Sequence, residues 1–114
     1  MRLILNGRIT EDTLKIFKSA DDSLITGRIL NADGTVYDMT SATATLEVYD
    51  TVNRKNAASV SWALVTVVAA NGSFSFTPAV ATTNLVPGTY YVYLKSTIAG
   101  VTLISDNYYK LTVG

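Results

Sequence analysis

The acidic residues are the part of this sequence whose side chains could do chemistry. The sequence has no histidine and no cysteine. A Ser-His-Asp triad, a histidine general base and thiolate chemistry are therefore excluded. Neither the GxGxxG nor the GxxxxGKS/T phosphate-binding motif occurs. Nine Asp and Glu residues remain, and a pair of them would be needed for a glycosidase.

Most of these carboxylates fall in predicted turns, where Asp normally caps backbone N–H groups. The candidates are Asp21, Asp22, Asp33, Asp38, Glu47, Asp50 and Asp106. Because turn caps account for most of them, we expect no catalytic pair and no enzyme. Asn31, Asp33 and Asp38 would offer oxygen ligands to calcium, but the ligand order of an EF-hand is absent. We therefore expect neither a metal nor a cofactor.

Aromatic side chains are the other resource for binding. Three tyrosines stand together in "NLVPGTYYVYL", residues 84–94. Because side chains alternate between two faces along a strand, Tyr90 is expected in the core and Tyr91 and Tyr93 on the solvent face. Interfaces favour tyrosine for its apolar ring and its hydroxyl group. Tyr91 and Tyr93 are therefore candidate interface residues.

The same stretch fits a structural motif, the tyrosine corner of a Greek-key sandwich. In this motif a tyrosine hydroxyl donates to the backbone a few residues upstream. Leu85 would fill the core, Pro87-Gly88 would turn the chain, and Tyr90 would be the corner tyrosine. Val92 stands where antibody domains have a cysteine. If the Tyr90 bond is buried, Tyr90→Phe should cost about 1–2 kcal/mol.

Short strands must position all of these residues. Runs rich in Thr, Val, Ile, Leu and Tyr alternate in polarity between turn residues. The pattern predicts an all-β, immunoglobulin-like sandwich of about seven antiparallel strands with Greek-key connections. "IAGV", residues 98–101, predicts a hairpin, and residues 105–107 should interrupt the last strand. The predicted strands are Thr13–Lys18, Ser23–Leu30, Ala44–Tyr49, Ser59–Val68, Ser73–Thr77, Thr89–Ser96 and Val101–Val113.

Length and charge limit the partners. A chain of 114 residues, 48% hydrophobic and 16% charged, is long enough for one hydrophobic core. Nine basic and nine acidic residues are scattered without a run, so we expect neither nucleic acid nor an anionic membrane as a partner. No apolar run is long enough for a signal peptide or a transmembrane segment.

Residues 1–12 precede the sandwich, which is predicted over residues 13–114. Their sequence, "MRLILNGRITED", has an apolar centre at Leu3, Ile4 and Leu5 with charged flanks. One interpretation is an edge strand of the chain's own sandwich. The other is an arm that pairs with an open strand edge of a neighbouring subunit. In that second case Leu3, Ile4 and Leu5 would be interface residues.

Two stretches resemble a known family. Residues 21–50 have an acidic strand start, an Asp-Gly-Thr turn, and Asp38-Met39-Thr40 before an alternating strand. Residues 71–97 have Asn-Gly, a Phe-x-Phe strand, and then Leu-x-Pro-Gly-Thr-Tyr. This order is similar to the N-terminal immunoglobulin-like domain of bacteriophage baseplate upper proteins and of related tail or capsid accessory modules. The similarity runs from about residue 21 to the C-terminus.

The resemblance implies a virion structural or accessory protein in a baseplate, tail or capsid. Such a protein would act through assembly contacts and not through catalysis. Its partners would be other virion proteins or further copies of itself, and its location would be the virion after assembly in the host cytoplasm. The alternative class is a carbohydrate- or cell-surface-binding adhesin module, which would need exposed aromatic side chains for a glycan.

Overall fold

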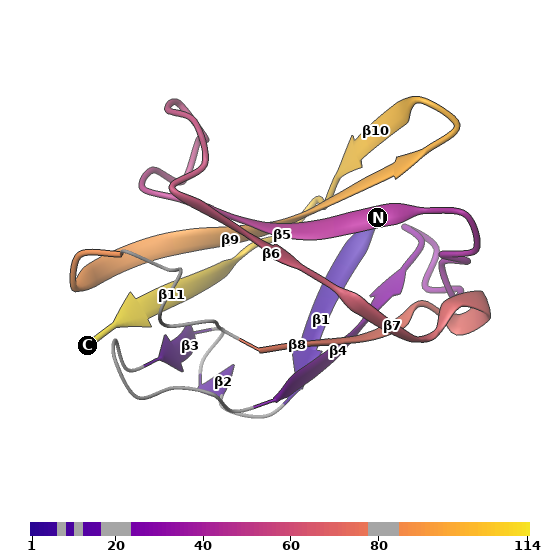
Figure 1. The fold of residues 1–114 in the computed structure, drawn as a ribbon, viewed down its shortest axis with the longest axis horizontal. Helices are drawn as coiled ribbons and strands as arrows, with labels where there is room; N and C mark the ends of the chain where they lie inside the picture. Colours follow the sequence, from indigo (N-terminus) through magenta and orange to yellow (C-terminus); the bar gives the residue numbers. More distant parts are fainter. Residues whose placement is uncertain (7–8, 11–12, 17–23, 78–84) are drawn as a thin grey trace.

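The computed structural model is an all-β protein built from two sheets (Figure 1). It describes residues 1–6, 9–10, 13–16, 24–77 and 85–114. Within these residues the helical structure is a single 3-10 turn, η1 (Ala69–Asn71). None of the described segments is a helix long and apolar enough to cross a membrane.

The smaller sheet has four antiparallel strands in the order β1-β4-β8-β7. These are β1 (Arg2–Asn6), β4 (Ile25–Leu30), β8 (Ser73–Phe76) and β7 (Val65–Val68). The larger sheet has the order β2-β3-β11-β9-β5-β6, and β10 pairs with β9 beside this path. Its strands are β2 (Ile9–Thr10), β3 (Thr13–Ile16), β11 (Tyr109–Val113), β9 (Gly88–Ile98), β5 (Thr43–Tyr49), β6 (Val60–Ala63) and β10 (Val101–Ile104). Strands β3 and β11 run parallel.

One hydrophobic core lies between the two sheets. Period-2 alternation explains it, since along β4 every second residue is buried and the two residues between them, Thr26 and Arg28, are exposed. The smaller sheet contributes Leu3, Leu5, Ile25, Ile29, Phe74 and Phe76. The larger sheet contributes Leu14, Leu46, Val48, Trp62, Val92, Leu94, Leu111 and Val113.

Glycine is required in β4 where Phe74 packs against the backbone. Gly27 and Phe74 are paired across β4 and β8. A Cβ atom at position 27 would lie 2.6 Å from the Phe74 ring and 2.6 Å from the Ile4 carbonyl oxygen. No side chain at position 27 fits in that space, which is occupied by the ring of Phe74.

The predicted strand Ser59–Val68 is wrong in one respect, because the chain changes sheets at Leu64. Residues before Leu64 form β6 beside β5 in the larger sheet, and those after it form β7 beside β8 in the smaller sheet. Both halves keep a strand-like pattern, so the change of sheet leaves no sign in the sequence. The expected hairpin between β9 and β10 is present, and β10 and β11 are separate strands as the turn residues 105–107 indicated.

In this chain β1 is an edge strand of the smaller sheet. It pairs with β4, and the side chains of Leu3 and Leu5 lie in the core. The outer edge of β1, on the side away from β4, is covered by the bend before β11 and by Tyr109. The Leu5 N–H donates to the Tyr109 hydroxyl at 3.2 Å, and the Asp106 N–H donates to the Met1 carbonyl at 2.8 Å.

Candidate functional site

The two Asp-x-Thr steps form local turn caps. Asp33 Oδ1 accepts hydrogen bonds from the Thr35 hydroxyl at 2.6 Å and the Thr35 N–H at 3.0 Å. Asp38 Oδ1 accepts from the Thr40 N–H at 2.8 Å. Hydrogen bonds from the threonine hydroxyl and N–H hold the pKa of each carboxyl below its ordinary value. These carboxylates thus have partners within their own turns.

Of the oxygen ligands considered for calcium, Asp33 and Asp38 accept hydrogen bonds within their own turns. The Asn31 side-chain nitrogen donates to the Thr35 hydroxyl and to the Val36 carbonyl, both at 3.0 Å, which ties it to the turn. Asp21 and Asp22 lie outside the described residues. Among the residues that are described, no three His, Cys, Asp or Glu side chains gather as a metal site.

Glu47 is the buried carboxylate of the described chain. It accepts hydrogen bonds from the Ser61 hydroxyl and from the Thr45 hydroxyl, the latter at 3.2 Å. The Lys95 ammonium lies 3.7 Å from its Oε1. These three neighbours satisfy both carboxylate oxygens on the outer face of the larger sheet.

Beside Glu47, four tyrosines form a cluster on the outer face of the larger sheet, which we call the tyrosine surface. It consists of Tyr49, Tyr91, Tyr93 and Tyr108. The ring centroids of neighbouring pairs are 5.5–5.8 Å apart and the rings meet edge to face. This geometry is favourable for aromatic pairs because a ring edge meets a ring face. Pairing of β5 with β9 places Tyr49 opposite Tyr91 and so brings the group together.

The interface assignment of Tyr93 requires correction. Its side chain lies on the predicted outer face, but it is only 8% exposed. Its hydroxyl donates to the Val52 carbonyl, and the Arg54 guanidinium lies 5.0 Å from its ring centroid. Alternation gives the face of a sheet, but it cannot show that the loop between β5 and β6 folds over that face. Tyr93 is therefore the buried centre of the tyrosine surface.

Burial also changes the acidity of Tyr93. Desolvation disfavours the phenolate and raises the pKa of Tyr93 above its ordinary value. The positive charge of Arg54 partly opposes this rise, and Tyr108 and Tyr49 add to it.

The accessible part of the tyrosine surface is formed by Tyr108, which is 39% exposed, and by half-buried Tyr91 and Tyr49. Sequence reasoning found Tyr91 and missed the other two. Tyr49 was detectable, since it follows Glu47 by two positions on the outer face of the same strand. Tyr108 lies in an irregular segment, where no periodicity indicates a side-chain direction.

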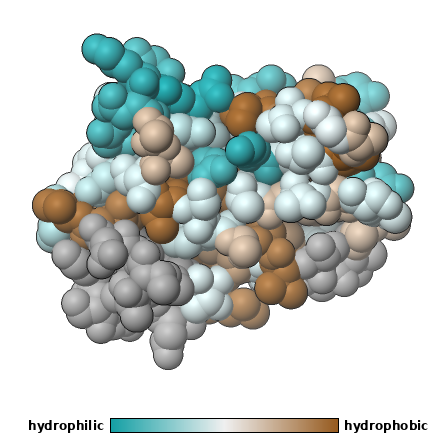
Figure 2. Space-filling model, turned by 45° about the horizontal axis from the view of Figure 1, so that its top comes forward, coloured by the Kyte–Doolittle hydropathy of each residue, from teal (hydrophilic) through white to brown (hydrophobic). Residues whose placement is uncertain are grey.

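Cations outnumber acidic residues on the outer face of the larger sheet and on its β5–β6 loop, within the described part of the chain. The exposed or half-exposed cations on this sheet and its β5–β6 loop are Lys15, Arg54, Lys55, Lys95 and Lys110. The acidic residues there are Glu47, which is bound to Lys95, and Asp50, which accepts from Asn56 at 3.2 Å. Figure 2, which brings this side forward, shows a hydrophilic loop at the upper left and small, separated hydrophobic patches.

The other predicted interface residues lie elsewhere. Leu3 and Leu5 are in the core, and Ile4, half-buried, is on the outer face of the smaller sheet. The five residues are therefore not brought together. Leu3 and Leu5 are needed by the chain's own core because the pairing of β1 with β4 turns both side chains inward.

The tyrosine-corner residues lie at the start of β9. Leu85 is buried, Gly88 begins the strand, and the Tyr90 hydroxyl donates to the Val86 carbonyl at 2.6 Å. This bond is exposed to solvent and the Tyr90 ring is half-buried at the margin of the core, in contrast to the buried bond expected.

No protein-family model and no curated protein matches the chain.

Proposed function

We propose that this chain is a structural or accessory protein of a bacteriophage particle and that it binds another protein of the particle through the tyrosine surface. The observation that carries the binding proposal is the cluster of four tyrosines, buried at its centre and accessible at Tyr108 and Tyr91. Rigid tyrosines lose little side-chain entropy on binding and offer both apolar area and a hydroxyl. The phage context rests on the resemblance of the Asp-Gly-Thr and Leu-x-Pro-Gly-Thr-Tyr motifs.

We also infer an immunoglobulin-like topology. Immunoglobulin sandwiches have strands A, B, E and D in one sheet and G, F and C in the other, with C′ added in variable-type domains. The order β1-β4-β8-β7 corresponds to A-B-E-D, and the order β11-β9-β5-β6 corresponds to G-F-C-C′. The hydrogen bond of Tyr90 at the start of β9, the equivalent of strand F, supports the same assignment.

Charge indicates the chemistry of the partner. Lys110 is opposite Tyr91 on the outer face, and Arg54 and Lys55 are on the adjacent loop. Opposite charges across an interface steer association and exclude like-charged partners. The partner surface should therefore combine an apolar patch for Tyr108 and Tyr91 with acidic residues around it.

The test combines genome context with binding. Genes beside this one should encode capsid or tail proteins, and one of their products, co-expressed with this chain, should bind it in a salt-sensitive manner. Tyr108→Ala should reduce its affinity by at least about tenfold, the scale of an interface hot spot. Lys110→Glu should slow association.

Arg2→Ala is the matched control, because Arg2 is exposed on the other sheet. Binding of a neighbouring gene product that is the same for Tyr108→Ala, Lys110→Glu and Arg2→Ala would exclude the tyrosine surface. Neighbouring genes for adhesins or glycan metabolism would contradict the phage assignment.

A further inference from the structure

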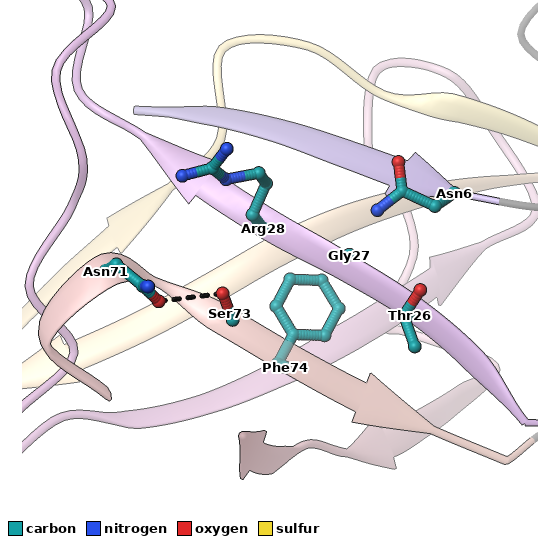
Figure 3. Close-up of a pocket in the computed structure, with 7 residues that line it drawn as sticks. All are labelled: Asn6, Thr26, Gly27, Arg28, Asn71, Ser73 and Phe74. Atoms are coloured by element: carbon teal, nitrogen blue, oxygen red, sulfur yellow. Dashed lines mark hydrogen bonds between the residues drawn. The ribbon is translucent and has the colours of Figure 1, made fainter. Parts of the chain in front are cut away.

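The smaller sheet has a polar hollow on the side opposite the tyrosine surface (Figure 3). Its volume is about 350 Å³. Five polar side chains line it, and Gly27 and Phe74 complete the lining. The five are Asn6, Thr26, Arg28, Asn71 and Ser73.

Strand register brings these side chains together. Asn6 of β1 is opposite Thr26 of β4, and Arg28 of β4 is opposite Ser73 of β8. Along β4, Ile25 and the other core residues point inward, so Thr26 and Arg28 point out of the sheet. Four of the five polar groups are thus fixed on three adjacent strands, and Asn71 comes from the short turn before β8.

The turn that carries Asn71 is held by the backbone. Gly72 has a φ of 70° and a Cβ there would lie 2.7 Å from the Ile29 carbonyl oxygen, so the turn requires glycine. Its carbonyl accepts from the Ile29 N–H at 3.0 Å. The Ser73 hydroxyl donates to Asn71 Oδ1 at 2.7 Å (Figure 3), which leaves the Asn71 amide nitrogen to donate to a ligand.

Arg28 gives the hollow its charge. No Asp or Glu is among the lining residues, and within the described chain the Arg28 guanidinium makes no ion pair. A guanidinium presents a planar fork of N–H donors that matches the two oxygens of a carboxylate. A single cation balances one negative charge, which favours a carboxylate over a phosphate monoester with a charge of nearly −2.

We propose that this hollow binds a uronate, that is, a carboxylated sugar residue of an acidic polysaccharide. Arg28 holds the carboxylate, and Asn6, Thr26 and Asn71 hydrogen-bond the ring hydroxyls. The volume is near the lower end of the roughly 300–1,000 Å³ typical of small-ligand sites, which suits a single sugar residue. The site is on the sheet opposite the tyrosine surface, so it does not depend on the protein-binding function proposed above.

Amide chemical-shift titration of the intact protein tests this site with galacturonate, galactose and acetate as probes. Galacturonate should shift the backbone amides of Gly27, Arg28 and Asn71. Galactose and acetate should each bind at least about tenfold more weakly, because each lacks one of the two sets of hydrogen bonds. Galactose or acetate binding as tightly as galacturonate, or no shift with galacturonate, would overturn the proposal.

Variants locate the binding on Arg28. Arg28→Ala should weaken galacturonate binding at least about tenfold, and Arg28→Lys should recover part of the loss because it keeps the charge but not the fork. Arg2→Ala removes an exposed cation from the same sheet face and should leave binding unchanged. The amide spectrum of each variant reports whether it is folded. Unchanged binding by folded Arg28→Ala would contradict the assignment.

Discussion

The side-chain amide of Asn107 binds both backbone groups of Leu3. Its Oδ1 accepts the Leu3 N–H at 2.8 Å, and its Nδ2 donates to the Leu3 carbonyl at 2.7 Å. An edge strand normally presents such groups to solvent, where they can pair with another chain. At Leu3 they are instead occupied within the molecule, so Asn107 acts as a short substitute for a neighbouring strand.

Asn107→Asp should destabilise the protein by about 1–3 kcal/mol, because the carboxylate cannot donate and faces the Leu3 carbonyl. Urea unfolding followed by the fluorescence of Trp62, the single tryptophan, measures this change. Asn56→Ala is the control, since its bond to Asp50 is exposed, and it should change stability by less than about 0.5 kcal/mol. Equal unfolding midpoints for the two variants would show that the Asn107 pairing adds nothing.

Tyr90→Phe should cost about 0.5–1 kcal/mol, at the lower end of the range for a hydrogen bond, because the bond to Val86 is exposed. Tyr90→Ala should cost more, since the ring also packs against the core. Thermal unfolding of both variants checks the order. A loss of about 2 kcal/mol or more for Tyr90→Phe would mean that the bond is shielded from water.

Tyr93→Ala should destabilise the chain by about 3 kcal/mol, as for other buried aromatic truncations. It removes the centre of the tyrosine surface, the hydroxyl bond to Val52 and the contact with Arg54. Tyr91→Ala should cost about 1 kcal/mol or less, because its ring is half-buried. Alternation alone would give the two variants similar effects. Denaturant unfolding of the two variants measures both losses of stability. Equal losses would contradict the finding that the β5–β6 loop covers Tyr93.

Stability should fall at alkaline pH through Tyr93. Its pKa in the folded protein is raised above the ordinary 10.0, mainly by burial. The neutral phenol is thus favoured by folding, so this stabilisation is complete below pH 10 and is lost as the pH rises through the folded-state pKa. Unfolding measured at several pH values above and below 10 should show a shallower decline for Tyr93→Phe. If the stability of Tyr93→Phe declines with pH as steeply as that of the unsubstituted protein, groups other than Tyr93 cause the decline.

Local features of the fold were predictable from the sequence. The Asp33 and Asp38 caps involve residues two positions apart, and the alternation that puts Tyr91 on the outer face of β9 puts Val92 and Leu94 in the core. In each case the information lies within a few residues of the chain. Turn chemistry and period-2 burial act over that range.

The features that were missed depend on contacts between distant residues. Tyr93 is buried by Val52, 41 positions away, and the edge of β1 is closed by Asn107, 104 positions from Leu3. The change of sheet at Leu64 likewise depends on which strands are already paired on either side. The alternation within a single sequence predicts the strands and the face on which each side chain lies. It does not show which loop covers a face or which side chain occupies a strand edge.

The parallel pairing of β3 with β11 has a mechanical consequence. Four residues, Thr13 to Ile16, are in register with Lys110 to Val113. Tension applied from the N-terminal side of β3 and the C-terminal side of β11 pulls the two strands along each other in opposite directions. The hydrogen bonds are then loaded together in shear and do not open one at a time. Pulling single molecules at the N-terminal side of β3 and the C-terminal side of β11 should give one abrupt rupture. A gradual extension at low force would show instead that the two strands unzip.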